Sequence, residues 1–422
     1  MLDALKNALR IPDLRKKIIY TAALLTVYRI GSFVPVPGVN AAALAQQLGI
    51  DGGNIFGFLD LFTGGALGRF TIFAMGVNPY ITASIIMQLL TIVIPHLEQL
   101  AKDGGDGRKV IAQYTRYGTV MLGLVQAFGI TMMARNWGVL TDPSLFGLLL
   151  IMLTLTAGTS FLMWLGEKIS ENGIGNGISM LIFVGIVSRM PMGVINAFRA
   201  VGEGGLNFFS LIVFGLLGVV VIAGIVMVQQ GQRRIPVQYA KRVVGRKMYG
   251  GQSTHLPLKV NQAGVIPVIF ASSVLTFPLT LAQFMPAVGI INRWIGYGTF
   301  GYNLLYALLV VFFTYFYTAV TFNPQEVSNN MKKNGGFIPG LRPGRSTTEY
   351  LDRVLTRITL PGAIFLALIA VLPYIVAGIT GIPQSFLYFG GTGLLIMVGV
   401  ALDTMKQIES HLLLRHYEGF LK

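Results

Sequence analysis

Long stretches without a charged side chain constrain this chain more than any other feature. Uncharged runs of 28, 33, 32 and 45 residues separate, in turn, Arg69 from Glu98, Lys259 from Arg293, Arg293 from Glu326, and Arg357 from Asp403. Because a bilayer crossing needs about 20 mostly apolar residues, each run is long enough to span a membrane, and the last is long enough to span it twice. The turn-forming sequence GITGIPQS divides that last run at residues 378–385.

The same criterion applied along the whole chain predicts an all-α polytopic membrane protein with about ten transmembrane helices. Their expected centres are residues 27, 86, 125, 156, 181, 218, 273, 312, 367 and 398. With 53% hydrophobic and 12% charged residues, the chain has about half the charged fraction of a soluble protein. This composition excludes a water-soluble enzyme.

The distribution of Lys and Arg predicts the orientation. The loops on the side shared by both termini hold 26 of the 32 basic residues, and the opposite loops hold five. By the positive-inside rule, both termini are cytoplasmic. Attraction to anionic lipid headgroups accounts for most of the net charge of +15. The cytoplasmic loops 230–262 and 323–357 are more basic than orientation requires, which leaves open an acidic or RNA-bearing partner.

Few residues are of the types that catalyse reactions or bind metal ions. The chain has no Cys and four His, with no metal-ligand spacing among them. Ser170 beside Glu171 is more typical of a capping or interfacial residue than of a nucleophile. We therefore expect no catalytic residue, no metal site and no cofactor. A channel with an apolar wall fits best. A secondary transporter of small solutes is disfavoured because buried acidic residues are missing from the predicted spans.

Residues 54–74 form an irregular element, too short and too rich in Gly to cross the membrane and too apolar to lie in water. We interpret them as a re-entrant helix covered by protein; an interfacial amphipathic helix is the alternative. Five spans on each side of the middle suggest two inverted, pseudo-symmetric halves. These halves are residues 1–189 and 208–422, joined by a connection at 190–207, and the second half ends in a C-terminal tail.

Several long motifs resemble the SecY family, the protein-conducting channels of the bacterial Sec translocon. They are PYITASIIMQLL (79–90), GRKVIAQYTRYGT (107–119), MWLGEKISENGIGNGIS (163–179), GQRRIPVQYAKRVVGR (231–246), YGGQSTHLPLKVNQAGVIPVIFASS (249–273), GGFIPGLRPG (335–344) and YFGGTGLLIMVGVALD (388–403). The resemblance extends over essentially the whole chain. It implies an hourglass pore between two five-helix halves, a lateral opening toward lipid, and a plug formed by the re-entrant segment. A membrane insertase without a vertical pore is a further alternative, and the plug-like segment argues against it.

The resemblance also assigns residues to the pore and the plug. The pore ring is expected at Val77, Ile81, Ile178, Ile182, Ile269 and Ile396. The plug residues are Ile55, Phe56, Phe58, Leu59, Phe62 and Leu67. The family favours Ile in the ring, so Val77 is one methylene smaller. Without the resemblance, each ring residue is indistinguishable from ordinary core packing.

The lateral gate is expected between spans two and three on one side and spans seven and eight on the other. Ser84, Gln88 and Asn261 supply polar groups in the matching helices. Ordinary interhelical hydrogen bonds are the alternative role, at about 0.6 kcal/mol each. A signal sequence would shift the gate by binding its open state better.

The resemblance implies that the chain is no enzyme, that it resides in the bacterial plasma membrane, and that SecA ATPase or a translating ribosome drives it. SecE and SecG subunits and preproteins with signal sequences are the other expected partners. Contacts to SecA or the ribosome are expected at Arg246, Lys247 and Arg342. Alternatively, each of these basic residues serves only to set the membrane topology. This alternative is weakest for Arg342, because Gly340 and Pro343 hold it in a rigid turn.

Overall fold

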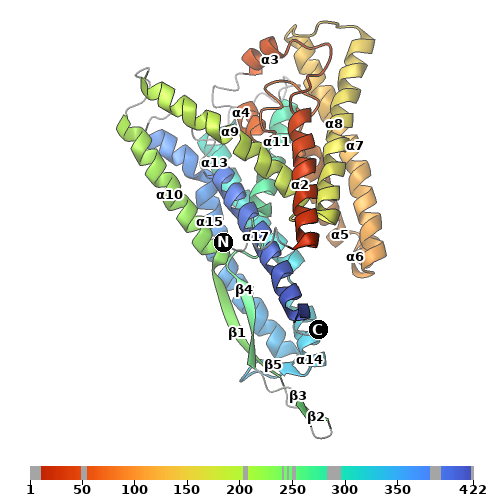
Figure 1. Cartoon of the computed structure of the whole chain (residues 1–422), viewed down its shortest axis with the longest axis vertical. Coiled ribbons are helices and arrows are strands. Elements are labelled where there is room, and N and C mark those ends of the chain that lie inside the picture. Colours follow the sequence, from red (N-terminus) through yellow and green to blue (C-terminus); the bar gives the residue numbers. More distant parts are fainter. Residues whose placement is uncertain are drawn as a thin grey trace.

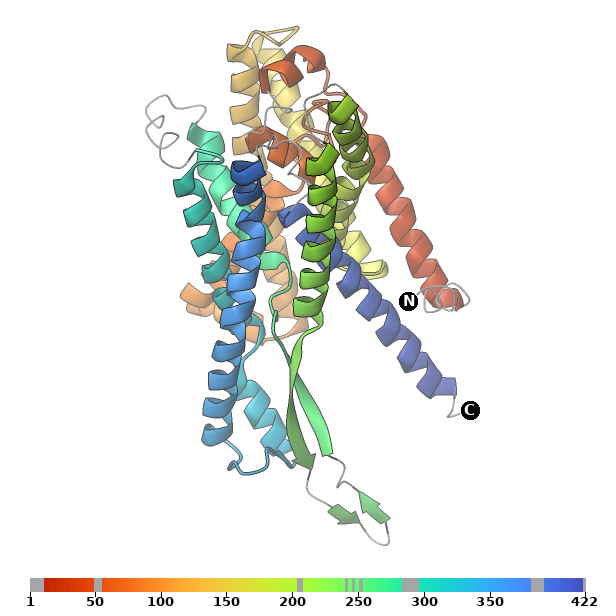
Figure 2. The same ribbon diagram turned by 90° about the vertical axis from the view of Figure 1, so that its left-hand side faces the viewer.

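The computed structural model describes residues 11–48, 55–202, 208–239, 242–244, 247–249, 253–282, 296–380 and 391–419. A bundle of long helices forms its body, and a narrow extension of strands and short helices projects from one end (Figures 1 and 2). The long helices are α2 (Pro12–Gly31), α5 (Asn78–Val93), α7 (Gly105–Asn136), α8 (Leu145–Asn172), α9 (Gly177–Gly202), α10 (Phe208–Gln230), α11 (Ile266–Ala282), α13 (Phe300–Thr321), α15 (Arg345–Thr380) and α17 (Thr392–Gly419). Shorter helices are α3 (Ala41–Leu48), α4 (Ile55–Phe62), α6 (Pro95–Lys102) and α14 (Pro324–Lys333).

A helix covers each of the ten expected span centres. Within the described residues, six helices are long and apolar enough to cross a bilayer: α7, α8, α9, α10, α13 and α15. Helices α5 and α6 meet the same test together, although the chain bends by 101° between them. Pro95 stands at this bend, where its missing N–H prevents α5 from continuing. A multispan helical membrane protein is therefore confirmed, and the number of ten crossings stays a prediction.

The helices form two groups that meet along two seams. Helices α2, α5, α7, α8 and α9 belong to the first group, and α10, α11, α13, α15 and α17 belong to the second. The groups contact each other chiefly through α5 against α11 and α9 against α17. Helix α9 continues to Gly202, so much of the connection expected at 190–207 is helical. The uncharged run ended at Arg189, but a single arginine does not end a helix.

Two small antiparallel sheets are formed by the segments 230–262 and 323–357, which the sequence analysis treated as cytoplasmic loops. Strand β1 (Gln232–Tyr239) pairs with β4 (Ser253–Lys259) and with β5 (Gly336–Phe337), and β2 (Arg242–Val244) pairs with β3 (Lys247–Tyr249). Alternate residues Ile235 and Val237 of β1 are buried, as expected for a sheet with one face covered. They share a cluster with Met331 of α14 and Leu351 of α15. The two large loops are thus packed into one platform.

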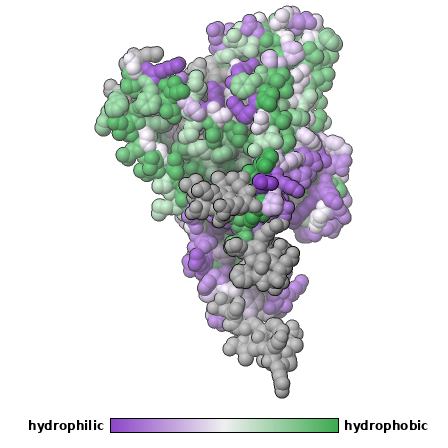
Figure 3. Space-filling view, viewed as in Figure 1, coloured by the Kyte–Doolittle hydropathy of each residue, from purple (hydrophilic) through white to green (hydrophobic). Residues whose placement is uncertain are grey.

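Contacts at the two ends of the bundle agree with the predicted sidedness of the loops. Leu14 near the start of α2, Ile174 between α8 and α9, and Ile408 on α17 form one cluster. At the other end, Val39 bridges to Leu140, joining two loops predicted to lie on the opposite side. Apolar residues predominate on the visible face of the helical body, with hydrophilic patches also at its upper end and lower right side (Figure 3).

Candidate functional site

Five of the six predicted ring residues lie on the four helices that join the two groups, and the sixth directly precedes one of them. Ile81 is on α5, Ile178 and Ile182 are on α9, Ile269 is on α11 and Ile396 is on α17; Val77 caps α5 and precedes its first residue. Five of the six are at most 7% exposed, and Ile178 is half-buried. Val77, Ile81, Ile182, Ile269 and Ile396 belong to the main hydrophobic core of the bundle, and Ile178 packs against that core. The helices that join the two groups therefore carry apolar, mostly buried side chains at the predicted ring positions.

A polar cavity of about 370 Å³ opens on the strand-bearing side of these residues. Lys259 at the end of β4 and Asp403 and Lys406 of α17 supply its charged lining. Ile266 and Val400 also line it, and each lies about one helical turn from a ring residue, Ile269 and Ile396 respectively. A cavity with charged residues in its lining thus leads toward the ring residues.

Helix α4 is the central element of the predicted plug. Phe56, Phe58, Leu59 and Leu67 are buried, and Phe62 is half-buried; nothing is described of the Ile55 side chain. This burial agrees with a re-entrant helix covered by protein and argues against an interfacial helix. The helical part is shorter than expected, since it ends at Phe62 while the plug segment was predicted over 54–74. Gly64, with its φ of 66°, follows the helix in a left-handed conformation that favours glycine.

Carbonyl groups at the end of α4 accept hydrogen bonds from the surrounding chain. Tyr28 Oη donates to Thr63 O at 3.1 Å. Arg29 Nη1 and Arg69 Nη2 both donate to Gly64 O, at 3.2 and 3.1 Å. Helix C-termini leave such carbonyls unpaired and carry partial negative charge, so cationic donors suit this position.

One charged residue of this segment was missed by the sequence analysis. Asp60 on α4 is 1% exposed and forms an ion pair with Arg189 of α9. Its carboxylate also accepts a hydrogen bond from Gly68 N–H at 2.7 Å. The available signal was that Asp60 is the one charge among residues 52–68, because an ionisable group in an apolar membrane segment needs a partner.

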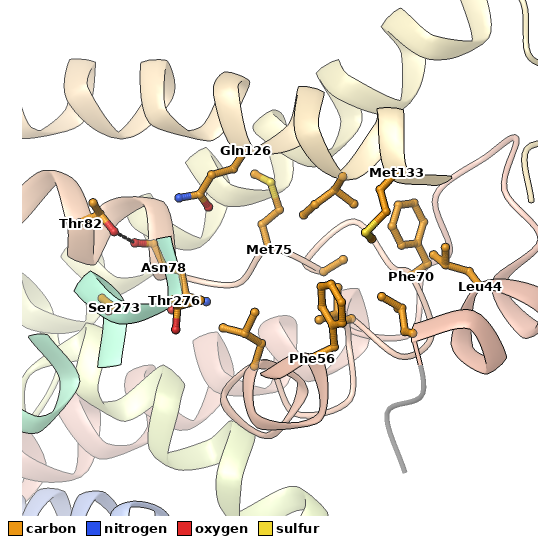
Figure 4. Close-up of a pocket in the computed structure, with 15 residues that line it drawn as sticks. Leu44, Phe56, Phe70, Met75, Asn78, Thr82, Gln126, Met133, Ser273 and Thr276 are labelled. Atoms are coloured by element: carbon orange, nitrogen blue, oxygen red, sulfur yellow. Dashed lines mark hydrogen bonds between the residues drawn. The ribbon is translucent and has the colours of Figure 1, made fainter. Parts of the chain in front are cut away.

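A small cavity of about 50 Å³ lies between the plug segment, α5, α7 and α11. Figure 4 shows Asn78 and Thr82 of α5 close to Ser273 and Thr276 of α11 at one end, with Leu44 and Phe70 at the other. Gln126 of α7 adds another polar side chain. These five polar residues lie where the lateral gate was expected, and the sequence analysis did not select them.

The residues that it did select lie differently. Gln88 Nε2 donates to Ser84 Oγ at 3.2 Å, within α5 itself and not across the seam. Asn261 lies in the turn before α11, not in a helix, and its Nδ2 donates to Gly264 O at 2.9 Å. Gly264 has a φ of 65°, which reverses the chain before α11 begins. Asn261 was therefore wrongly placed within the matching helix.

On the strand-bearing platform, Arg342 is exposed in the turn between β5 and α15. Its carbonyl accepts a hydrogen bond from Thr347 Oγ1 at 2.9 Å, and Gly340 and Gly344 flank it with positive φ. Lys247 lies in β3, with its side chain undescribed, and Arg246 lies outside the described residues. Among the described residues, no three His, Cys, Asp or Glu side chains are grouped to hold a metal ion.

Comparisons with known proteins agree on one family. The SecY family model matches residues 71–405. The chain is 50% identical to the protein translocase subunit SecY of Halalkalibacterium halodurans over 435 residues, covering 100% of both chains. It is 49% identical to the same subunit of Thermotoga maritima over 433 residues, covering 100% of this chain and 98% of the other.

Solved structures of similar fold include one described as a protein-conducting channel, with a TM-score of 0.67, 18% identity, and 94% and 92% of the two chains covered. A second solved structure has a TM-score of 0.66 at 18% identity, with the same coverage. Its description says that the plug domain of SecY stabilises the closed state of the translocation channel and maintains a membrane seal. Sec61 in a canine ribosome-channel complex has a TM-score of 0.63 at 17% identity, again covering 94% and 92%. At these identities, the likeness concerns the fold.

Proposed function

The chain belongs to the SecY family, and from that premise we propose that it is the channel-forming subunit of a protein translocase in the bacterial plasma membrane. It passes unfolded preproteins between its two helix groups. One observation supports the proposal most: the predicted ring residues lie on or beside α5, α9, α11 and α17, the helices through which the two groups meet, and five of the six are buried. The polar cavity reaches to about one helical turn from Ile269 and Ile396, and the buried plug helix α4 packs against α9.

An apolar ring suits this task for two physical reasons. Its side chains offer no hydrogen-bonding group to which an extended polypeptide would adhere, so a passing chain does not become trapped. A narrow apolar constriction also resists water and ions by dewetting. The plug segment adds a second barrier, since α4 packs against α9, the helix that carries the ring residues Ile178 and Ile182.

We propose that the seam between α5 with α7 and α11 with α13 is the lateral gate, through which transmembrane segments of client proteins leave for the lipid. Thr82, Ser273 and Thr276 line the cavity at this seam. Polar contacts between membrane helices are individually weak, at about 0.6 kcal/mol. The hydroxyls of Thr82 and Thr276 donate within their own helices, to Asn78 O at 3.1 Å and to Ser272 O at 2.7 Å. They therefore do not tie the two helices together, and the seam can open reversibly when a signal sequence binds the open state better.

The platform of strands and α14 is the proposed cytoplasmic contact for SecA ATPase or a translating ribosome, with Arg342 exposed on it and Arg246 and Lys247 nearby in sequence. The Sec61 relative in a ribosome-channel complex supports the ribosome as a partner. SecE and SecG complete the proposed complex, and anionic lipids contact the basic loops. Both termini are cytoplasmic, and energy comes from the partner because the subunit itself is not an enzyme.

The experiment that tests this function is transport in reconstituted vesicles. The chain with SecE and SecG is placed in lipid vesicles, and SecA, ATP and a preprotein with a signal sequence are added outside. We expect the preprotein to become protected from added protease. Vesicles with the partners alone, and complete vesicles without ATP, are the controls. No protected preprotein in the complete system would contradict the proposal.

A further inference from the structure

We propose that Asp60 and Arg189 position the plug: their ion pair is a latch that holds α4 in its seat against α9. The inference rests on the proposed channel function and adds two residues to it. Asp60 belongs to the plug helix and Arg189 to α9, a helix that also carries the ring residues Ile178 and Ile182. The latch therefore joins the barrier directly to the wall of the pore.

The burial of Asp60 explains why the pair controls the position of α4. At 1% exposure, the carboxylate has lost its water and depends on the groups around it. The Gly68 N–H satisfies part of its hydrogen-bonding capacity at 2.7 Å, and Arg189 supplies the opposite charge. Without that cation, the seated position would contain an uncompensated buried charge, which is strongly unfavourable.

The backbone of α9 is shaped to receive α4 at this point. Gly185 lies one helical turn before Arg189, so both face the same side of α9. A Cβ atom added to Gly185 would lie 2.5 Å from Phe62 O, and one added to Gly64 would lie 3.0 Å from the Gly185 Cα. The missing side chain at Gly185 permits the close approach, and Arg189 then meets Asp60. The close backbone contact at Gly185 and the ion pair at Arg189 together fix the position of α4 along α9.

The pair is also suited to repeated release. The Arg189 side chain is 33% exposed, so water reaches one partner even in the seated state. When α4 leaves, hydration replaces the ion pair on both groups, and neither charge remains buried alone. Arg29 and Arg69, which donate to Gly64 O, surround the same end of α4 with positive charge. These two arginines donate to the backbone, whereas the ion pair of the Asp60 carboxylate is with Arg189.

A second contact of the plug reaches the other helix group. Phe58 lies against Tyr297, with ring centroids 5.9 Å apart, and Tyr297 lies against Tyr302 of α13, with ring centroids 5.2 Å apart. The latch to α9 is ionic, whereas this contact is aromatic. Separation of the two groups would first break the aromatic contact, and the latch would retain α4 on the side of α9 until its ions are hydrated.

The test compares four channels in planar bilayers without preprotein: wild type, Arg189→Gln, Asp60→Asn and the double variant. Arg189→Gln leaves Asp60 buried without its cation, so we expect idle ion conductance to rise by about tenfold. Asp60→Asn keeps the shape and an acceptor for Gly68 N–H, and leaves a partly exposed Arg189, so a smaller rise is expected. In the double variant no buried charge remains, and conductance should fall below that of Arg189→Gln alone.

This partial restoration distinguishes a latch from lost packing, which a second substitution would not repair. A Cys at Phe62, in a chain that has no natural Cys, reports plug position through its labelling by a membrane-impermeant thiol reagent. The extent of labelling should rank the four channels in the same order as their idle ion conductance does. Arg199→Gln, which removes an exposed arginine further along α9, is the matched control and should match wild type in both measurements.

Deletion of residues 57–67 serves as the reference for a missing plug and should conduct at least as well as Arg189→Gln. If the deletion leaks while Arg189→Gln retains wild-type conductance and labelling, the latch is overturned and the channel proposal is unaffected. If the double variant leaks more than Arg189→Gln, the ionic explanation is likewise overturned. If the deletion does not leak, the plug provides no seal, and both the seal and the latch are overturned, while ATP-driven transport still tests the channel separately.

Discussion

Arg342 is the residue at which the proposed partner contact can be tested most sharply. Its turn is flanked by glycines of positive φ, and its side chain is exposed. A guanidinium so presented can form bidentate, charge-assisted hydrogen bonds to a carboxylate or an RNA phosphate. We expect Arg342→Glu to abolish SecA-driven export, and Arg342→Lys to weaken it less, because Lys keeps the charge without the forked geometry. Protease-protected preprotein, measured at equal channel amounts, reports the effect.

Arg345 provides a control with the same change of charge. It is 93% exposed and paired with Glu349 at 2.9 Å, in the first turn of α15. Exposed pairs of this kind contribute only about 0.3–0.5 kcal/mol, so Arg345→Glu should retain most of the transport activity. Equal transport by Arg342→Glu and Arg345→Glu would reduce Arg342 to a topology-setting charge.

For individual residues, the sequence indicated which side chains are buried better than it indicated which side chains they contact. The ring residues came from the family resemblance, since no periodicity distinguishes Ile182 from any other core isoleucine. Asp60 was overlooked because the segment was read for its average hydrophobicity, and its partner Arg189 lies 129 positions away in the sequence. Asn261 was assigned to a helix because its motif continues into α11, whereas Gly264 forces a turn first.

Among the elements, the proposed lateral gate can be locked chemically. Thr82 of α5 and Thr276 of α11 line the same cavity from opposite sides of the seam. Cysteines at these two positions, joined by a short linker with a thiol-reactive methanethiosulfonate group at each end, should stop transport until a reductant cleaves the resulting disulfides. The expected loss is at least tenfold, since the two helices can no longer separate.

A cross-link within one helix is the matched control. Ser84 and Gln88 are already hydrogen-bonded at 3.2 Å along α5, so cysteines there can be joined without bridging the seam. Transport should continue at the wild-type rate in this variant. Normal export through a channel fully linked between Thr82 and Thr276 would place the gate elsewhere.

Helices were predictable from the sequence, and strands were not. Uncharged runs of membrane-spanning length locate helices because the bilayer leaves unpaired backbone groups no alternative. Outside the membrane that constraint is gone, and β1 and β4 are polar strands; besides pairing with β4, β1 also pairs with β5, which lies far along the chain. Pro236 within β1 and Pro257 within β4 also argue against strands in a single-sequence interpretation.

For the whole molecule, the predicted orientation has a direct test. Reporter fusions after residue 340, in the basic platform, should score cytoplasmic, and fusions after residue 142, beside the bridge of Val39 to Leu140, should score extracytoplasmic. Fusions at residues 245 and 382, both outside the described part of the chain, should score cytoplasmic and extracytoplasmic. A cytoplasmic signal at 382 would contradict ten crossings with both termini inside.

The arrangement of the molecule explains why its pore residues are scattered through the sequence. The four helices that carry the ring are those at which the two helix groups meet, α5 with α11 and α9 with α17. Such a seam can widen without unfolding either group, because each keeps its own neighbours. Composition and charge predicted two groups of helices, but only the packed structure identifies which helices face each other.

Cross-linking of a passing chain tests the central claim, that polypeptides travel through the ring between the helix groups. A photoreactive side chain replaces Ile269, a predicted ring residue that is 7% exposed. In the control it replaces Leu216 of α10, which is 66% exposed on the surface of the bundle. A preprotein is then stalled in transit by a folded domain at its C-terminus. We expect ATP-dependent cross-links from Ile269 and none from Leu216. Cross-links from Leu216 without any from Ile269 would contradict the account.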